Sequence, residues 1–363
     1  MKPLLKEWIV LTIVLIFTQT LLHGQDRDML WVKTDLARKT DISKIDRKHT
    51  PHKYQQYTLK LDQLKEQLRD APDRKQISLQ QGVVMSFPNG SGEQELFEVY
   101  DAAIMESSLQ QEFPQILSYV GKSQKDPNTV IRFSVTDLGI HAMTMESSGN
   151  RVYIDPVSKD GTAYMAYHGK DLQSSDPFVC LVDEIATTKP QDLPVSARPS
   201  NANDGNLRTF RLAVATTGEY SQFHLTRQGI PVGATDAVKK SAVMSAIVIT
   251  ITRVNAIFER DVAITMELVA NNKDIIFLDS AADSFTNNNP DNLILESQTV
   301  IDDIIGNENY DIGHTFSTGG GGLAQLPSAC HTEGKAKGVT GIENPIGDKY
   351  DIDYVTHEIG HQF

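Results

Sequence analysis

The hydrophobic pattern of this sequence changes once, at a polar segment rich in Pro, Ser, Asn, Asp and Gly at about residues 189–206. Such a composition, without apolar periodicity, is typical of an accessible linker. A chain of 363 residues exceeds what one ordinary hydrophobic core holds, so a boundary here divides it into two folded regions. We expect each region to have a separate core.

The region before the linker is predicted to be a mostly antiparallel β domain. Turn residues, for example at 147–150, separate short β-prone runs. These runs lie at 96–100, 130–135, 140–143, 151–154 and 163–167. Ahead of them, leucines at residues 59–68 have mostly helical spacing, and residues 25 to about 55 are predicted to be loosely ordered.

After the linker, strands and helices alternate. Alternating apolar residues predict strands at 210–214, 262–268 and 312–316. Apolar residues at steps of three and four predict a helix over 243–258, and a second helix begins at Pro290 and ends before Gly306. This order is an α/β arrangement, so the predicted fold class is α+β overall, a β-rich domain followed by an α/β domain.

The first residues have the pattern of a signal peptide. Lys2 and Lys6 give a positive start, residues 8–22 are almost continuously apolar, and Gly24 offers a small residue for cleavage. We therefore expect a signal peptide at 1–24 and a secreted protein with no membrane segment in its mature form. The apolar run is short for a span of about 20 residues, and the alternative is an uncleaved anchor at the cell surface.

The last residues of the chain carry a metal-binding pattern. His357 and His361 are four residues apart, which places them on one face of a helix, where two imidazoles can bind one zinc ion. Glu358 can then take a proton from a zinc-bound water that attacks a peptide carbonyl. The alternative is a helix with two exposed or packed histidines. Tyr354 and Val355 argue against it, because they give this helix a buried face.

Further stretches extend this pattern. Gly360 stands inside the terminal string His-Glu-Ile-Gly-His, and earlier matching stretches lie at 212–220, 254–258, 322–324 and 338–341. In these features residues 207–363 resemble the reprolysin-like (adamalysin-type) metalloproteases, which are metzincins. The resemblance implies an α/β metzincin catalytic domain with His357 and His361 as ligands of one catalytic Zn²⁺ and Glu358 as the general base.

The same resemblance implies how the rest of the protein is organised. Residues 25–200 are similar to the propeptides that precede such domains, so the chain is expected to be an inactive precursor. Metzincins carry a third zinc-binding histidine, expected here at position 367, so we expect the catalytic domain to be incomplete and this form to be inactive. A structural Ca²⁺ cannot be derived from the residues.

Other residues near the motif have two interpretations each. The glycines at 319–322 form either a flexible turn or a strand at the rim of a cleft, and the resemblance gives Gly322, Leu323 and Ala324 the substrate-binding part. Cys330 is expected, by resemblance, to form a disulfide with a cysteine beyond residue 363. His314 and His331 are expected to be packed or surface histidines.

Cys180 has a functional and a structural interpretation. It lies late in the region before the linker, between apolar neighbours, and a buried thiol in this setting is common. The alternative is a cysteine switch, in which the thiolate occupies the open position of the zinc ion and excludes water.

Together these features predict a secreted zinc-dependent metalloendopeptidase precursor acting on proteins or peptides. The net charge of −13 argues against nucleic-acid binding, which needs a basic surface. Two alternatives are a non-catalytic secreted binding protein on a metzincin scaffold and a zinc peptidase whose third ligand is a downstream glutamate. Retention of Glu358 argues against the first, since a binding protein needs no base beside the histidines.

Overall fold

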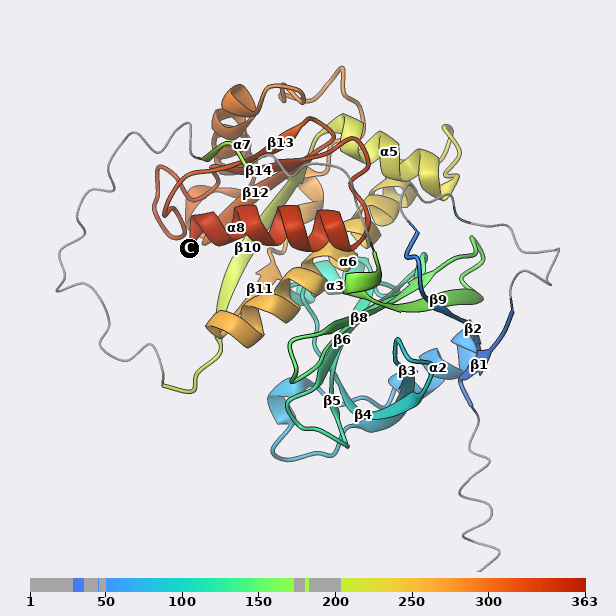
Figure 1. Cartoon of the computed structure of the whole chain (residues 1–363). Helices are drawn as coiled ribbons and strands as arrows, with labels where there is room; N and C mark the ends of the chain where they lie inside the picture. Colours follow the sequence, from blue (N-terminus) through green and yellow to red (C-terminus); the bar gives the residue numbers. More distant parts are fainter. Residues whose placement is uncertain (1–28, 36–44, 46–49, 173–179, 183–203) are drawn as a thin grey trace, which may run out of the picture.

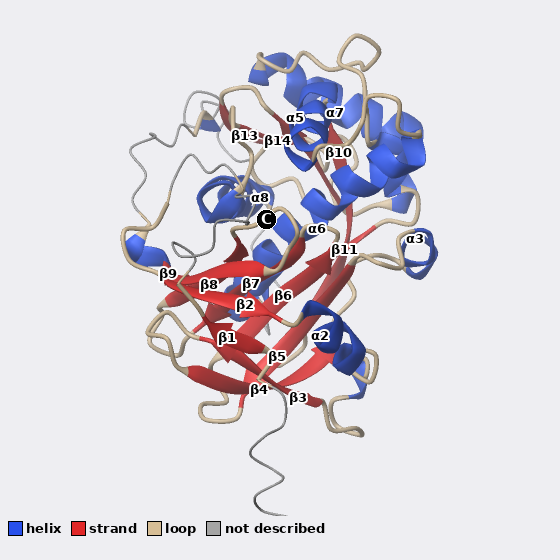
Figure 2. Ribbon diagram, turned by 90° about the vertical axis from the view of Figure 1, so that its right-hand side faces the viewer, coloured by secondary structure: helices blue, strands red, loops and turns tan. Residues whose placement is uncertain are grey.

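The structure, a computed structural model, describes residues 29–35, 45, 50–172, 180–182 and 204–363 (Figure 1). The predicted signal peptide at 1–24 and nearly all of the predicted linker at about 189–206 lie outside these residues. Two β-sheets form the body of the protein, and the long helix α6 (Asp236–Val262) runs between them (Figures 1 and 2). This mixture of helices and sheets confirms the predicted α+β class.

The first sheet is antiparallel throughout and has nine strands in the order β1-β2-β9-β8-β7-β6-β5-β4-β3. The strands are β1 (Trp31–Lys33), β2 (Gln55–Leu59), β3 (Val83–Pro88), β4 (Gln94–Asp101), β5 (Leu117–Ser123), β6 (Val130–Thr136), β7 (Gly139–Met145), β8 (Arg151–Pro156) and β9 (Ala163–His168). The short helices of this part are α2 (Leu61–Leu68), η2 (Arg74–Gln76), α3 (Ser107–Glu112) and η3 (Gly169–Asp171). The antiparallel β prediction is confirmed.

One part of the predicted lead-in is ordered, contrary to expectation. Trp31 in β1 is 1% exposed and its ring contacts those of Phe87 and Tyr164. An indole buries a large apolar surface, which stabilises a strand even where the surrounding sequence is polar. The prediction of a loose segment at 25–55 is therefore wrong for this strand.

The second sheet has five strands in the order β11-β10-β12-β14-β13 and is parallel except for the pair β13–β14. Its strands are β10 (Arg208–Thr216), β11 (Ile264–Leu268), β12 (Ile312–Ser317), β13 (Gly321–Ala324) and β14 (Gly338–Gly341). The helices of this part, besides α6, are α5 (Gly218–Gln228), η5 (Asn272–Ile275), α7 (Pro290–Ile305), η6 (Asn307–Asn309), the π-helix η7 (Lys349–Val355) and α8 (Thr356–Gln362). The predicted α/β order is confirmed, except that Val262 ends α6 instead of beginning a strand.

Helix α6 is the central element of the molecule. The hydroxyl of Thr235 caps its N-terminus by accepting a hydrogen bond from the Val238 amide. Among the described residues it is the one helix that is long and apolar enough to cross a membrane, but 89% of its most apolar window is buried inside the protein. It is therefore the core helix of this fold.

The first part has a core of its own, because one apolar cluster lies wholly within residues 30–166, but the two parts also share apolar contacts, which the expectation of separate cores did not include. Ile104 and Met105, which follow β4, belong to the same apolar cluster as Leu268 of β11. The backbone continues this contact, since the amide of Leu268 donates to the carbonyl of Ile104 at 2.7 Å. A second cluster joins Met143 of β7 to Ala256 of α6. The first sheet thus encloses an apolar core of its own and also packs on α6.

A buried arginine joins the two parts electrostatically. Arg253 of α6 is 1% exposed and donates to Asp155 of β8 at 2.5 Å and to Asp351 of η7 at 3.0 Å. Asp155 also accepts a hydrogen bond from Tyr167 at 2.8 Å. Burying a charge is costly unless it is paired and hydrogen-bonded, and here both conditions are met.

Candidate metal centre

The two histidines of the motif lie on one face of α8, as their spacing predicts. The π-helix η7 leads directly into α8, and Thr356 at the junction donates its hydroxyl to the carbonyl of Asp351 at 2.8 Å. Val355 and Ile359 are fully buried in the main apolar cluster, which fixes the opposite face of the helix. The His357 and His361 rings are left on the accessible side.

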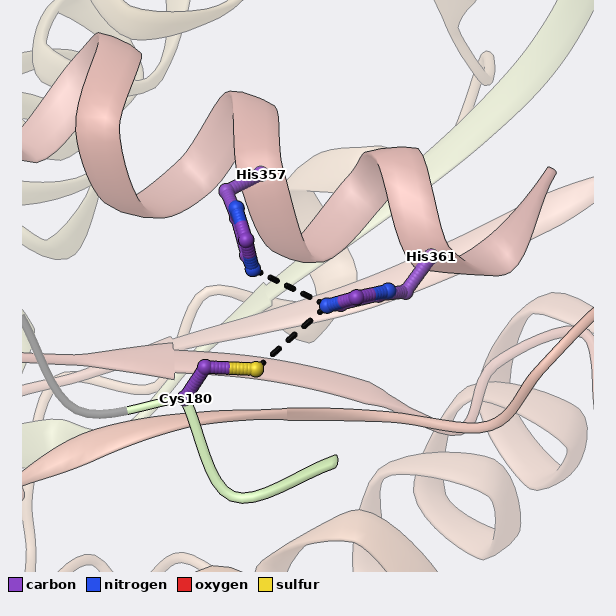
Figure 3. A group of neighbouring side chains, drawn as sticks. All are labelled: Cys180, His357 and His361. Carbon is purple, nitrogen blue, oxygen red and sulfur yellow. Dashed lines mark hydrogen bonds between the residues drawn. The ribbon is translucent and has the colours of Figure 1, made fainter. Parts of the chain in front are cut away.

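The structure adds a third side chain to these histidines. The Nε2 atoms of His357 and His361 are 2.9 Å apart, and Cys180 Sγ lies 3.4 Å from His361 Nε2 (Figure 3). One nitrogen or sulfur atom from each residue lies within 4.8 Å of the other two. This position is the one that the cysteine-switch interpretation of Cys180 requires. A thiol buried in a core far from the histidines would not lie here.

Cys180 reaches the histidines because its segment lies along the edge strand β13. It forms a parallel β-bridge with Gly322, and the next amide, that of Leu181, donates to the Gly322 carbonyl at 3.0 Å. This contact uses the exposed edge of the five-stranded sheet, where an additional chain can be bound through its backbone.

The three donors fit a zinc ion. Tetrahedral zinc with bonds of about 2.0–2.1 Å to nitrogen and 2.3 Å to sulfur places its ligand atoms about 3.3–3.6 Å from one another. The 3.4 Å separation of Sγ and Nε2 lies in this range, and the 2.9 Å separation of the two nitrogens is somewhat shorter. Burial lowers the pKa of His357, which favours the neutral imidazole that binds metal. No second group of this kind lies among the described residues, so the structure gives no support to a calcium site.

Glu358 is held in an unusual environment for a carboxyl group. It is completely buried, and among the described residues only the Cys180 thiol offers its oxygens a hydrogen bond. Burial raises the pKa of Glu358 to about 8, and the neighbouring Cys180 side chain opposes the rise. A buried carboxyl with so little hydrogen bonding is destabilising, so a side chain kept in this state is a candidate for a functional role.

Gly322 is placed against this carboxyl group. A methyl group added at Gly322 would overlap the Oε1, Cδ and Cγ atoms of Glu358. Sequence reasoning assigned this glycine to the approach of a substrate, and the structure shows a further reason for it, since only glycine leaves room for the glutamate.

The other two predicted substrate-binding residues are buried in this form, in which the 180–182 segment covers the strand, and their substrate-binding part stays a prediction. Leu323 is completely buried and Ala324 is 3% exposed, both in β13. The observed contact at this strand is through the backbone of Gly322. Residues 318–320, just before the strand, form a bend, so the glycine run is part turn and part edge strand.

A glutamine that sequence reasoning missed anchors the metal-binding helix. Gln362 donates from Nε2 to the Gly313 carbonyl at 2.9 Å, so its Oε1, 2.8 Å from His314 Nδ1, accepts from that ring nitrogen. His314 Nε2 then accepts from the Thr340 hydroxyl at 2.8 Å. This chain of bonds ties the end of α8 to β12 and β14. No sequence motif predicts this role of Gln362, because the role depends on contacts with residues that are distant in the sequence.

The remaining candidates lie away from the centre. His314 is a packed histidine, as predicted, and His331 is exposed. Cys330 is an exposed free thiol with a left-handed backbone conformation (φ 65°), and the predicted disulfide to a cysteine beyond residue 363 stays a prediction.

A comparison with protein families agrees with this site. Residues 244–363 match the family described as Metallo-peptidase family M12B Reprolysin-like. This range begins within α6 and contains β13, α8 and both histidines. A search of curated proteins gives no match for the chain.

Proposed function

We propose that the chain is the secreted precursor of a zinc metalloendopeptidase, kept inactive by its own Cys180, since residues 244–363 match the reprolysin-like metallopeptidases of family M12B. Peptidases of this family act on proteins or peptides. The observation that carries the proposal is the convergence of Cys180, His357 and His361 at one point. In this proposal residues 1–24 are the signal peptide, 25–200 the propeptide and 207–363 the catalytic domain.

In the active enzyme His357 and His361 would hold the zinc ion, and a third histidine expected at position 367 would complete the ligand set. When bound, a zinc ion would make a coordinated water more acidic and polarise the substrate carbonyl. Glu358 takes the proton of the attacking water and then gives it to the leaving amine.

Latency follows from the position of the 180–182 segment. The Cys180 thiol lies where water would otherwise reach the ligands, and the Leu181 amide occupies the carbonyl of Gly322 on the edge strand. The segment thereby covers both the histidine ligands and the backbone of the edge strand at Gly322. The complete burial of Glu358 argues against a binding protein without catalysis, because burying a carboxyl is costly and such a protein gains nothing from it.

The test is the substitution Glu358→Gln in the full-length protein after removal of its propeptide. Glutamine keeps the shape of the side chain and cannot take the proton, so casein hydrolysis should fall by about 10²- to 10⁴-fold while bound zinc, measured by metal analysis, is retained. Glu343→Gln is the matched control, because Glu343 is exposed and outside the centre. A Glu358→Gln variant that hydrolyses casein at the wild-type rate, or a wild type insensitive to chelators, would contradict the proposal.

A further inference from the structure

A second contact of the 180–182 segment lies beside the metal centre. Val182 is 4% exposed and packs in a small apolar cluster with Leu293 and Ile294 of α7, Leu323 of β13 and Val339 of β14. This cluster is distinct from the main core around α6, which has no member in common with it. We call the four residues around Val182 the α7 pocket.

The walls of the α7 pocket and its occupant come from different parts of the chain. All four wall residues lie in the second sheet or in α7, within the part matched by the metallopeptidase family. Val182 comes from the segment that brings Cys180 to the histidines, and Leu181 packs on the same cluster. When this segment leaves the metal centre, Val182 leaves with it, and the walls become an apolar recess beside the edge strand.

We propose that in the mature enzyme the α7 pocket is a specificity pocket that binds an aliphatic side chain of the peptide substrate. This inference rests on the proposed peptidase function. The wall is formed by two leucines, an isoleucine and a valine and offers no side-chain hydrogen bond or charge, so it favours Val, Ile or Leu and rejects charged residues. Val182 occupies it here as the stand-in for that side chain, next to β13, along which a peptide can pair.

The experiment uses the full-length protein after removal of its propeptide, with peptide libraries in which one position varies at a time. The wild type should prefer aliphatic over charged residues at one position by about tenfold or more in kcat/KM. Ile294→Thr should reduce that preference by about tenfold and leave other positions unchanged. Leu293→Ala, which enlarges the pocket, should shift the preference towards larger apolar residues.

The matched control is Leu295→Thr, because Leu295 is the next residue of α7 and 56% exposed. Melting curves show which variants fold. If Leu293→Ala does not fold, Ile294→Thr, which is the milder change, provides the test. The wild type could cleave casein while the folded pocket variants keep its cleavage preference. That result would overturn the specificity pocket and leave the peptidase assignment intact. A wild type that cleaves no peptide would remove both.

Discussion

At Cys180, one side chain connects two parts of the chain that are far apart in the sequence. Its sulfur contacts His361, 181 residues further on, and its backbone pairs with Gly322. Sequence reasoning could list the thiol as a candidate ligand from its chemistry, whereas its arrival at the histidines depends on tertiary packing. The histidines themselves were predictable, because their separation by one helical turn is a local property.

The first prediction at this scale concerns the thiol. Cys180→Ser in the full-length precursor should raise casein hydrolysis before any cleavage of the chain, since a hydroxyl is a much poorer zinc ligand than a thiolate. X-ray absorption at the zinc edge should show one sulfur ligand near 2.3 Å in the wild type and none in the variant. Cys330→Ser, which removes the exposed thiol, is the control and should change neither result. Coordination by nitrogen and oxygen alone in the wild type would rule out the switch.

The second residue prediction concerns Gly322. Gly322→Ala should lower activity by at least tenfold, because the new methyl group would displace the Glu358 carboxyl from its place. Gly320→Ala is a close control, since a methyl group there meets no atom within 4 Å and its backbone is not in the left-handed region. Equal activity in the two variants would show that the glutamate moves aside without loss.

At the scale of elements, helix α8 is stabilised at its end by polar contacts to the sheet. Gln362 and His314 form a buried chain of hydrogen bonds that reaches Thr340. Burial lowers the pKa of His314 from 6.5 to about 4, so this histidine stays neutral in the folded protein over most of the physiological range. Its protonation would place a charge in a buried site and remove the acceptor for Thr340.

The pH dependence of stability follows from this shift. Below the unfolded pKa of 6.5 the unfolded chain binds a proton that folded His314 does not, so the free energy of unfolding should fall as the pH drops from about 6.5 to about 4. The loss from His314 is about 3 kcal/mol. His224, whose pKa burial lowers to about 3, should add to it over the same range. Urea unfolding at several pH values measures the slope.

His314→Gln should make that slope shallower, because its titration is removed while that of His224 is retained. His331→Gln, at an exposed position, is the control and should leave the slope unchanged. A His314→Gln variant with the wild-type slope would mean that the buried ring is not the group responsible.

The elements were largely predictable from periodicity, and the exceptions have physical causes. A β-prone run identified the strand that became β6, alternation identified β10, and apolar steps of three and four identified α6. The π-helix η7 was not predicted, since its local sequence differs little from that of an α-helix and its wider turn is set by packing. Trp31 was missed because a three-residue strand gives almost no periodic signal.

At the scale of the whole molecule, the first sheet is a packing partner of α6 and η7. Arg253 pairs with Asp155 of the sheet and Asp351 of η7, and a second buried arginine, Arg132 of β6, pairs with Glu259 of α6. Sequence patterns could not predict this interface, because a polar linker suggests independence and charged residues are usually expected at the surface. The fold class was predictable, whereas the arrangement of its two parts was not.

The interface prediction uses Asp155→Asn. Removing one partner of a buried ion pair should lower the free energy of unfolding by about 3 kcal/mol, because Arg253 keeps its charge and loses a counterion. Asp261→Asn, in the exposed pair with Arg260, should cost less than about 1 kcal/mol. Urea unfolding compares the two. If both substitutions lower the free energy of unfolding by less than about 1 kcal/mol, Asp351 alone is a sufficient partner for Arg253.

The same interface affects what happens after a cut between the two parts. With a protease site inserted between residues 189 and 200, the cut wild type should elute from gel filtration as one species, since the apolar clusters and ion pairs persist. The cut Asp155→Asn protein should separate at a lower urea concentration. Cleavage and release are then two events, and a clipped molecule can stay latent.

The outer edge of β13 has a consequence for solubility. The strand consists of Gly321, Gly322, Leu323 and Ala324, with no charge and no proline, and it ends the five-stranded sheet. Uncovered strands of this composition pair readily with other chains, and proteins usually protect them with charges or with covering segments. Here the covering segment is 180–182. The precursor should therefore tolerate higher concentrations than the mature enzyme, whose free edge would favour self-association until a substrate occupies it.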